Sequence, residues 1–324
     1  MDYVRLGRTA LSVSPLCLGT LNFGVRTSVD EAYDLMDAAL SQGINFFDTA
    51  NHYGWQVHRG LTEEIIGDWF AKGGGRREKV VLGSKVCNSM SDWPNDRGLS
   101  MRHIIAACDD SLRRLRTDWI DVYQMHHADP HASWEEVWQA MELLVQQGKV
   151  RYVGSSNFTG WSLAAGQERA RARNNLGLVS EQCLYNLVNR QPELEIVPAA
   201  QAYQIGVLAC SPLHGGLLGG GLRKLADGTA VKTAQGRAMV AIETRRADIA
   251  AYESICARAG FDPAELAQAW LLHRPGVTAV VTGPRTMAHL DAAIHALKLE
   301  LDDNLLAELD RIFPPMVSQI PQAW

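Results

Sequence analysis

The sequence lacks the features that mark several classes of protein, beginning with paired cysteines. Its six cysteines are scattered through 324 residues without a C-x-x-C pair, which excludes a dense disulfide scaffold and indicates reduced thiols. No stretch approaches the ~20 apolar residues of a membrane span, and no apolar signal core follows Met1. We therefore expect a cytoplasmic protein without membrane insertion.

Basic residues are too few and too dispersed for a surface that binds polyanions. The net charge is −5, and no run of Lys or Arg is longer than two residues, as at Arg76-Arg77. Because nucleic acids and acidic membranes are recognised by basic patches, we expect neither as a partner. With 47% hydrophobic residues and only 12 prolines, the chain can bury a sizeable core. We expect a small molecule as its partner, and a homo-oligomer remains open.

Short runs rich in Val, Ile and Leu alternate with longer amphipathic segments from about residue 14 to residue 300. The alternation repeats eight times and is typical of βα units. Eight right-handed parallel crossovers close most naturally into a barrel rather than an open sheet. The sequence therefore predicts an α/β fold, a (β/α)8 TIM barrel, in one domain over residues 1–324.

The boundaries of the predicted elements follow from this alternation. The predicted strands are residues 15–18, 45–47, 80–83, 120–124, 150–153, 178–180, 207–209 and 278–281. The predicted helices are residues 29–41, 62–71, 100–115, 133–147, 160–173, 192–203, 246–259 and 286–297, with a capping box at Ser133 and Glu136. An N-terminal β-hairpin at 3–11 would plug the barrel floor, and an extra C-terminal helix is expected at 302–311, followed by a tail at 320–324. The glycine-rich segment 215–221 predicts a mobile loop.

Four polar residues follow the predicted strands at the carboxyl-terminal mouth of the barrel, where such folds carry their active sites. They are Asp48 after the second strand, Tyr53 on the loop behind it, Lys85 after the third strand and His126 after the fourth. Singly, each also fits an ordinary role, as a turn or cap, a rim aromatic, a solvated charge and a packing histidine. Their joint placement at one end of the barrel favours a catalytic role for all four.

These residue types suit proton donation to a carbonyl oxygen. An ammonium in the mouth is costly to desolvate unless a carboxylate pairs with it, and Asp48 can supply that carboxylate to Lys85. A nearby cation lowers the pKa of a phenol by ~1–3 units, so we expect Lys85 to tune Tyr53 as the proton donor. His126 can hydrogen-bond the substrate oxygen and stabilise the charge that develops on it.

The other strand ends carry groups suited to a nucleotide. Residues 154–158 (GSSNF) and Gln182 offer hydroxyls and amides for a carboxamide, whereas Arg285, near a predicted helix start, suits a phosphate. The sequence thus favours a nicotinamide at one end of the mouth and a phosphate at the other.

Motifs spread over essentially the whole chain match one family of barrel enzymes. They are Leu18-Gly19-Thr20, Phe47-Asp48-Thr49-Ala50 with Tyr53-Gly54, Gly83-Ser84-Lys85, residues 121–126 (DVYQMH), residues 154–158, Gln182 with Tyr185-Asn186, and Ser211-Pro212-Leu213. On these residues the chain resembles the aldo-keto reductases. The resemblance implies a catalytic tetrad of Asp48, Tyr53, Lys85 and His126, NADPH/NADP+ as the cofactor, and hydride delivery from C4 of the reduced nicotinamide.

The resemblance also implies where cofactor and substrate bind. The implied cofactor contacts are Gly19, Thr20, Leu21, Asp48, Ser156, Asn157, Gln182, Cys210, Ser211, Pro212, Leu213, Gly215, Gly283, Arg285 and His289, with Ser156, Asn157 and Gln182 on the carboxamide and Gly283 and Arg285 on the adenosine phosphate. Candidate substrate contacts are Phe23, Trp55, Trp93 and His127, although each equally fits ordinary packing. No metal is expected.

Within the family, residues 124–161 resemble the branch that includes potassium-channel β subunits and, more closely, bacterial reductases of nucleotide-linked deoxysugar pathways, among them 2,3-enoyl reductases. His126 stands where steroid double-bond reductases of the family carry an acid, which favours reduction of an aldehyde, ketone or keto-sugar. The departures from the family pattern are Cys210 for an aromatic, Gly221 for a Lys, His289 for a Gln, and Ala292-Ala293 for Glu-Asn at the adenine. They lower the expected affinity for NADPH, but Arg285 still favours NADPH over NADH.

Two alternatives remain. His126, His127 and His131 cluster as in metal hydrolases, but His126 and His127 are adjacent and would point to opposite faces if the strand continued through them. The other alternative is an NADPH-binding, redox-sensing partner subunit with little turnover, as the likeness to channel β subunits implies.

Overall fold

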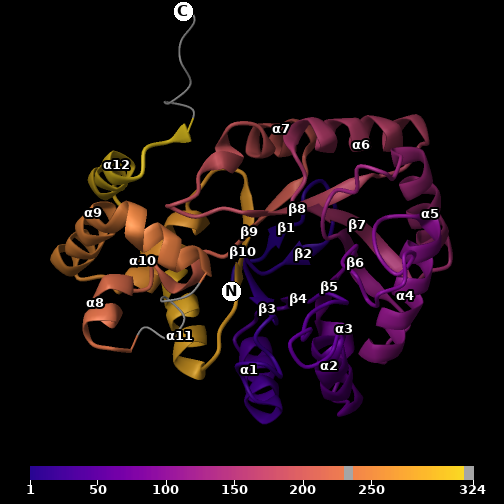
Figure 1. Ribbon diagram of the computed structural model, residues 1–324, viewed down its shortest axis with the longest axis horizontal. Helices are drawn as coiled ribbons and strands as arrows, with labels where there is room; N and C mark the ends of the chain where they lie inside the picture. Colours follow the sequence, from indigo (N-terminus) through magenta and orange to yellow (C-terminus); the bar gives the residue numbers. More distant parts are fainter. Residues whose placement is uncertain (230–235, 317–324) are drawn as a thin grey trace, which may run out of the picture.

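Eight parallel strands close into a barrel, as the sequence predicts (Figure 1). The computed structural model describes residues 1–229 and 236–316. Around the ring the order is β10-β3-β4-β5-β6-β7-β8-β9, so each strand lies beside its neighbours in sequence. The strands are β3 (Leu16–Gly19), β4 (Phe46–Asp48), β5 (Val81–Val86), β6 (Ile120–Met125), β7 (Val150–Ser156), β8 (Leu178–Leu184), β9 (Gly206–Cys210) and β10 (Val277–Thr282).

Several strands extend further toward their carboxyl ends than predicted. β5, β7 and β8 each gain residues at that end, because polar side chains there are buried and still hydrogen-bonded. Lys85 on β5, Ser155 on β7 and Glu181 on β8 are all fully buried. A search for apolar runs ends the strand at such residues, although a paired polar group is compatible with a barrel interior.

A short hairpin closes the barrel floor, as predicted, but its strands are β1 (Val4–Arg5) and β2 (Ser12–Val13). Figure 1 shows this hairpin within the ring of strands. Leu6 and Val13 pack in one apolar cluster with Phe46 and Val122 inside the barrel. The turn needs glycine, since Gly7 has a φ of 54° and a Cβ there would lie 2.6 Å from the Val179 carbonyl oxygen.

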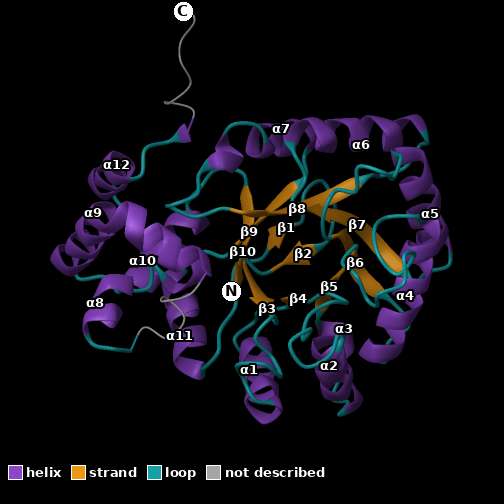
Figure 2. Ribbon diagram, in the orientation of Figure 1, coloured by secondary structure: helices purple, strands orange, loops and turns teal. Residues whose placement is uncertain are grey.

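Helices surround the strands (Figure 2). A second apolar layer is buried between these helices and the barrel. Three tryptophans, Trp69, Trp138 and Trp270, are fully buried in this layer. The helices are α1 (Val29–Ser41), α2 (Leu61–Ala71), α3 (Arg76–Lys79), α4 (Met101–Leu115), α5 (Trp134–Gln146), α6 (Gly160–Ala172), α7 (Ile196–Tyr203), α8 (Gly221–Ala226), α9 (Gly236–Ala259), α10 (Pro263–Leu272), α11 (Met287–Ala296) and α12 (Asp303–Ile312), with 3-10 turns η1 (Gln191–Glu193) and η2 (His214–Gly216). The extra C-terminal helix is confirmed as α12.

The interval between β9 and β10 holds more helix than the sequence predicts. α9 begins ten residues early and kinks at Arg245, and α10 was not predicted although Asp262 caps it and Pro263 opens it. The predicted mobile loop at 215–221 is instead the end of η2, a run of turns and the start of α8. The predicted tail at 320–324 lies outside the described residues. Among the described helices, none combines the length and apolar character needed to cross a bilayer.

The predicted capping box on α5 is half present. The Ser133 side chain accepts from the Glu136 N–H, but the Glu136 carboxylate accepts from the Met101 N–H at the start of α4. Glu136 therefore joins α5 to α4 rather than capping α5. A complete capping box occurs instead at Ser28 and Glu31 before α1.

The contact between α2 and α4 yields a stability prediction. A Cβ on Gly67, in the middle of α2, would lie 2.1 Å from the Arg114 carbonyl oxygen. Gly67→Ala should therefore lower the free energy of unfolding by about 1–3 kcal/mol through overpacking. Helix propensity alone predicts the opposite sign, a gain of up to about 1 kcal/mol. Urea unfolding decides between them, and a variant as stable as the wild type would contradict the packing.

Candidate active site

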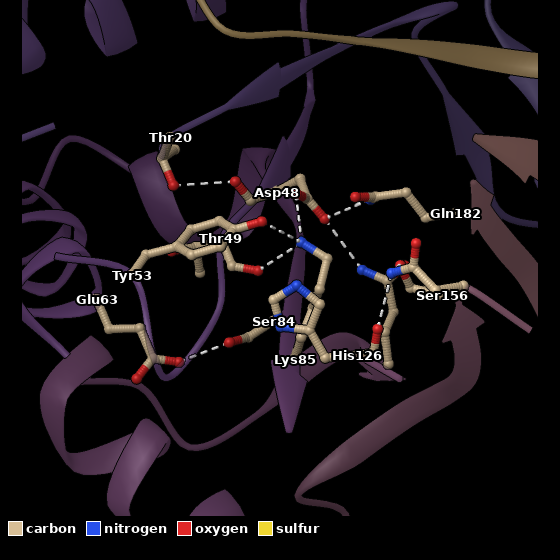
Figure 3. A network of polar contacts seen from close by, with 12 residues as sticks. Thr20, Asp48, Thr49, Tyr53, Glu63, Ser84, Lys85, His126, Ser156 and Gln182 are labelled. Carbon is tan, nitrogen blue, oxygen red and sulfur yellow. Dashed lines mark hydrogen bonds and ion pairs between the residues drawn. The ribbon is translucent and has the colours of Figure 1, made fainter. Parts of the chain in front are cut away.

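The centre of the mouth is an ammonium held by three oxygens (Figure 3). Lys85 Nζ lies 2.5 Å from Asp48 Oδ2, 3.0 Å from the Thr49 carbonyl oxygen and 3.2 Å from Tyr53 Oη. Lys85 is fully buried and Asp48 is 2% exposed. The structure thus brings together the carboxylate, the ammonium and the phenol that the sequence predicts to meet.

Residues from other parts of the barrel fix the orientation of Asp48. Its other carboxylate oxygen, Oδ1, accepts from Gln124 Nε2 at 3.0 Å and from Gln182 Nε2 at 2.9 Å, while its carbonyl oxygen accepts from the Thr20 hydroxyl at 2.9 Å. These partners come from β6, from β8 and from the loop after β3. Because both oxygens of the carboxylate are engaged, it cannot turn away from Lys85.

Burial and charge act in opposite directions on the two groups beside Asp48. Burial alone would lower the pKa of Lys85, but Asp48 and Tyr53 raise it above its ordinary value, so the ammonium stays charged. Burial raises the pKa of Tyr53 above its ordinary value, and the lowering by Lys85 only partly offsets this. The expectation of a net lowered phenol pKa is therefore wrong for the protein alone. Tyr53 keeps its proton, as a donor must.

His126 is a neutral imidazole. Burial, together with the positive charge of Lys85, lowers the pKa of His126 to about 2. Its ring packs edge-on against Tyr53, with centroids 5.7 Å apart, and its Nδ1 lies 3.0 Å from Nδ2 of Asn88. The ring therefore lies beside the phenol without carrying charge.

A cleft of about 980 Å³ extends from these residues across the mouth of the barrel. Asp48, Tyr53 and His126 line it, and Lys85 is buried behind them. Every residue predicted to contact the cofactor also lines it, namely Gly19, Thr20, Leu21, Asp48, Ser156, Asn157, Gln182, Cys210, Ser211, Pro212, Leu213, Gly215, Gly283, Arg285 and His289. One continuous cavity thus joins the tetrad to Arg285.

A buried carboxyl holds the segment that carries Ser156 and Asn157. Glu181 accepts from the Phe158 N–H at 3.0 Å and from the Ser155 hydroxyl. Asn157, at a φ of 60°, donates through Nδ2 to the His126 carbonyl oxygen at 2.9 Å and to Ser156 Oγ at 3.0 Å. The amide and hydroxyl at this end of the cleft are therefore fixed relative to His126.

The candidate substrate residues are only partly placed as predicted. Trp55 lines the cleft and stacks on His52, with ring centroids 5.1 Å apart. Phe23 is fully buried in the core, because its loop turns its ring inward, so the prediction that it lines the mouth is wrong. Trp93 is 76% exposed and lies outside the cleft lining, because its loop carries it into solvent. His127 also lies outside the lining and stacks on His126.

Other residues line the cleft without an individual role in the sequence analysis. Among them are the polar residues Arg26, His52, Asn88, Lys224 and Gln268. Gly221 stands where the family has a Lys, but Lys224, one helical turn further along α8, lines the cleft. Ala292 lines the cleft, but Ala293 is buried in the core, so only the first of the two departures at the adenine faces this cavity.

The histidine cluster does not form a metal centre. β6 ends at Met125, and the rings of His126 and His127 stack in parallel, with centroids 4.8 Å apart, rather than diverging. Within residues 1–229 and 236–316, no group of three or more His, Cys, Asp or Glu side chains converges on a position for a metal ion.

Sequence comparison agrees with this geometry. Residues 15–313 match the model of the family described as the aldo/keto reductase family. The chain is 49% identical over 328 residues to the uncharacterized oxidoreductase YrpG of Bacillus subtilis (strain 168), covering 100% of this chain and 99% of that protein. It is 33% identical over 342 residues to Protein tas of Escherichia coli (strain K12), covering 96% and 97%. It is also 34% identical over 295 residues to a probable voltage-gated potassium channel subunit beta of Oryza sativa subsp. japonica, covering 87% of each.

Glu181 yields a prediction on pH. Burial raises the pKa of Glu181 to about 8, so between pH 5 and pH 8 the folded state binds a proton that the unfolded state has lost. This contribution to stability is complete at low pH and is lost as pH rises. The free energy of unfolding of the wild type minus that of Glu181→Gln should therefore fall with rising pH, by at most about 1.4 kcal/mol per pH unit. Glu300→Gln, at an exposed position, is the control, and a pH-independent difference would contradict the assignment.

Proposed function

Because the chain belongs to the aldo/keto reductase family of oxidoreductases, we propose that it reduces a carbonyl group with NADPH and that Tyr53 donates the proton. The observation that carries the proposal is the position of Lys85 Nζ, 3.2 Å from Tyr53 Oη and 2.5 Å from Asp48 Oδ2. A phenol that loses its proton beside a fixed ammonium is stabilised as the charge develops.

The donor groups of the cleft fit NADPH. Ser156, Asn157 and Gln182 would hold the carboxamide, and Arg285 would bind the adenosine phosphate, supported by Lys224. Gln268 is 2% exposed and its Oε1 accepts no hydrogen bond from the described residues, which suits the amino group of an adenine. When bound, the reduced nicotinamide supplies the hydride.

The chain's own residues then supply the proton and the orientation. Tyr53 Oη donates to the substrate oxygen, and Lys85 stabilises the phenolate left behind. Asp48 keeps Lys85 charged and directs it, and the two glutamines keep Asp48 in place. A neutral His126 can hold the substrate oxygen but is too weak an acid to compete with Tyr53 for proton transfer.

The substrate we propose is an aldehyde, a ketone or a keto-sugar, including an intermediate of a nucleotide-linked deoxysugar pathway. A neutral imidazole polarises a carbonyl by hydrogen bonding, which supports carbonyl rather than enoyl reduction. Trp55 stacked on His52 offers an aromatic face at the mouth, where a sugar or aryl ring can pack. We further propose a cytoplasmic location, since no disulfide joins cysteines within the part of the chain that the structure describes, as suits a reducing compartment.

A second candidate is an NADPH-sensing partner subunit with little turnover. It is supported by relatives named as potassium channel β subunits, from Oryza sativa and Arabidopsis thaliana. It predicts very slow turnover on every carbonyl offered and stable association with a larger protein in pull-downs.

Tyr53→Phe tests the proton donor. The variant keeps the ring and its packing but loses the hydroxyl, so kcat should fall by about 10²–10⁴-fold. Cofactor affinity, followed by tryptophan quenching, should stay unchanged. A variant with near-normal kcat would remove Tyr53 from the mechanism.

Arg285→Ala tests the choice of cofactor. A charge-assisted hydrogen bond to a phosphate contributes about 1.5–3 kcal/mol, so the Kd for NADPH should rise by about 10–100-fold. The Kd for NADH, which lacks the 2′-phosphate, should change much less. Arg102→Ala, at an exposed position on α4 outside the cleft, should leave both affinities unchanged. Equal losses for the two nucleotides would contradict a phosphate contact.

A further inference from the structure

The side chain of Asn88 faces the tetrad histidine from the loop that follows Lys85. Its amide nitrogen Nδ2 lies 3.0 Å from His126 Nδ1, and both residues line the cleft. The family motifs assign Asn88 no role. Asn88 comes three residues after Lys85, so a short segment of chain connects Lys85 to the side chain that contacts His126.

A hydrogen bond from an amide N–H determines which nitrogen of a neutral imidazole carries the proton. Neutral histidine has one N–H donor and one bare acceptor nitrogen. Since Asn88 donates to Nδ1, that nitrogen is the acceptor and the proton resides on Nε2. The opposite tautomer would offer a bare Nε2, which accepts from Tyr53 or from a substrate hydroxyl but cannot donate to a carbonyl oxygen.

The backbone on both sides of Asn88 is fixed. Cys87 has a φ of 138°, a conformation that L-residues rarely adopt, and its carbonyl oxygen accepts from the Gly98 N–H at 2.7 Å. On the other side, the Ser89 carbonyl oxygen lies 3.1 Å from His52 Nδ1. The strained turn is thus held at both ends, which limits the freedom of Asn88 to move away from His126.

We propose that Asn88 is a positioning residue that holds His126 in its Nε2–H tautomer, so that His126 acts as a hydrogen-bond donor to the substrate oxygen. The role of His126 as a donor to the substrate rests on the proposed carbonyl reduction, whereas its tautomer can be observed in the protein alone. Asn88 touches no reacting atom and acts through the histidine.

Nitrogen NMR of protein labelled with ¹⁵N-histidine tests the tautomer without any activity assay. His126→Asn identifies the His126 signals by their loss. Wild type should show a protonated Nε2 and a bare Nδ1. Asn88→Asp replaces the donor with a carboxylate, which can only accept, so the proton should move to Nδ1. A bare Nε2 in wild type, or no change of tautomer in Asn88→Asp, would overturn the proposal.

Kinetics test the consequence. In Asn88→Asp, kcat for carbonyl reduction should fall by about 10²-fold, the loss expected for removal of one donor to a developing oxyanion. In Asn88→Ala, which leaves both tautomers accessible, the loss should be smaller, and cofactor Kd should change in neither variant. Asn95→Asp makes the same substitution at an exposed position of the same loop outside the cleft, and should behave as wild type.

The outcomes separate this proposal from the proposed function. If wild type reduces no carbonyl but its spectrum shows the Nε2–H tautomer and its switch in Asn88→Asp, the proposed function fails and the tautomer assignment stands. If wild type is active and Asn88→Asp keeps its kcat, the positioning role is wrong while the reductase assignment stands.

Discussion

The whole site depends on one buried ion pair, Lys85 with Asp48. A lysine without exposed surface keeps its charge only if a carboxylate compensates for the lost water, and loss of one partner from such a pair costs about 3–5 kcal/mol. Asp48 meets that need and is itself restrained by Gln124 and Gln182. These four residues lie on β4, β5, β6 and β8. The need to compensate the buried charge of Lys85 therefore brings the carboxyl ends of four strands together.

A second buried network supports the strand that carries Lys85. Ser84 donates to Glu63 on α2 (Figure 3). Arg114 on α4 donates to the same carboxylate at 2.8 Å. Glu63 has no exposed surface, and Arg114 forms an ion pair with it. Glu63 thus connects α2 and α4 to Ser84, the residue before Lys85. The packing of these two helices therefore influences the position of Lys85 in the mouth of the barrel.

Regular patterns made much of this structure predictable. Apolar alternation located eight strands, and the polar residues Asp48, Lys85 and His126 stood out because they come within two residues of the ends of the predicted strands. Prediction failed where burial and tertiary contacts, rather than the local residue pattern, decide the structure. The strands β5, β7 and β8 run on through buried polar residues, and α10 was missed although Asp262 and Pro263 mark its start. The sign of the Tyr53 pKa shift depends on burial, which no sequence motif reports.

The cleft itself was predictable in part only. Ser156, within a family motif, and Arg285, near a predicted helix start, were predicted to bind the cofactor and line the cleft. Asn88 and Lys224 reach the cleft from a strained turn and from a helix that sequence patterns do not specify. Phe23 shows the converse, because an aromatic on a mouth loop can turn into the core. Loop residues thus need three-dimensional placement before they are given roles.

The most direct test of the account is a single-turnover experiment in which enzyme loaded with NADPH is mixed with a panel of aldehydes, ketones and nucleotide-linked keto-sugars. The account predicts oxidation of the bound NADPH in stoichiometric amount by at least one carbonyl, with formation of the matching alcohol. Stable NADPH binding with no oxidation by any member of the panel would contradict the assignment of this site to carbonyl reduction.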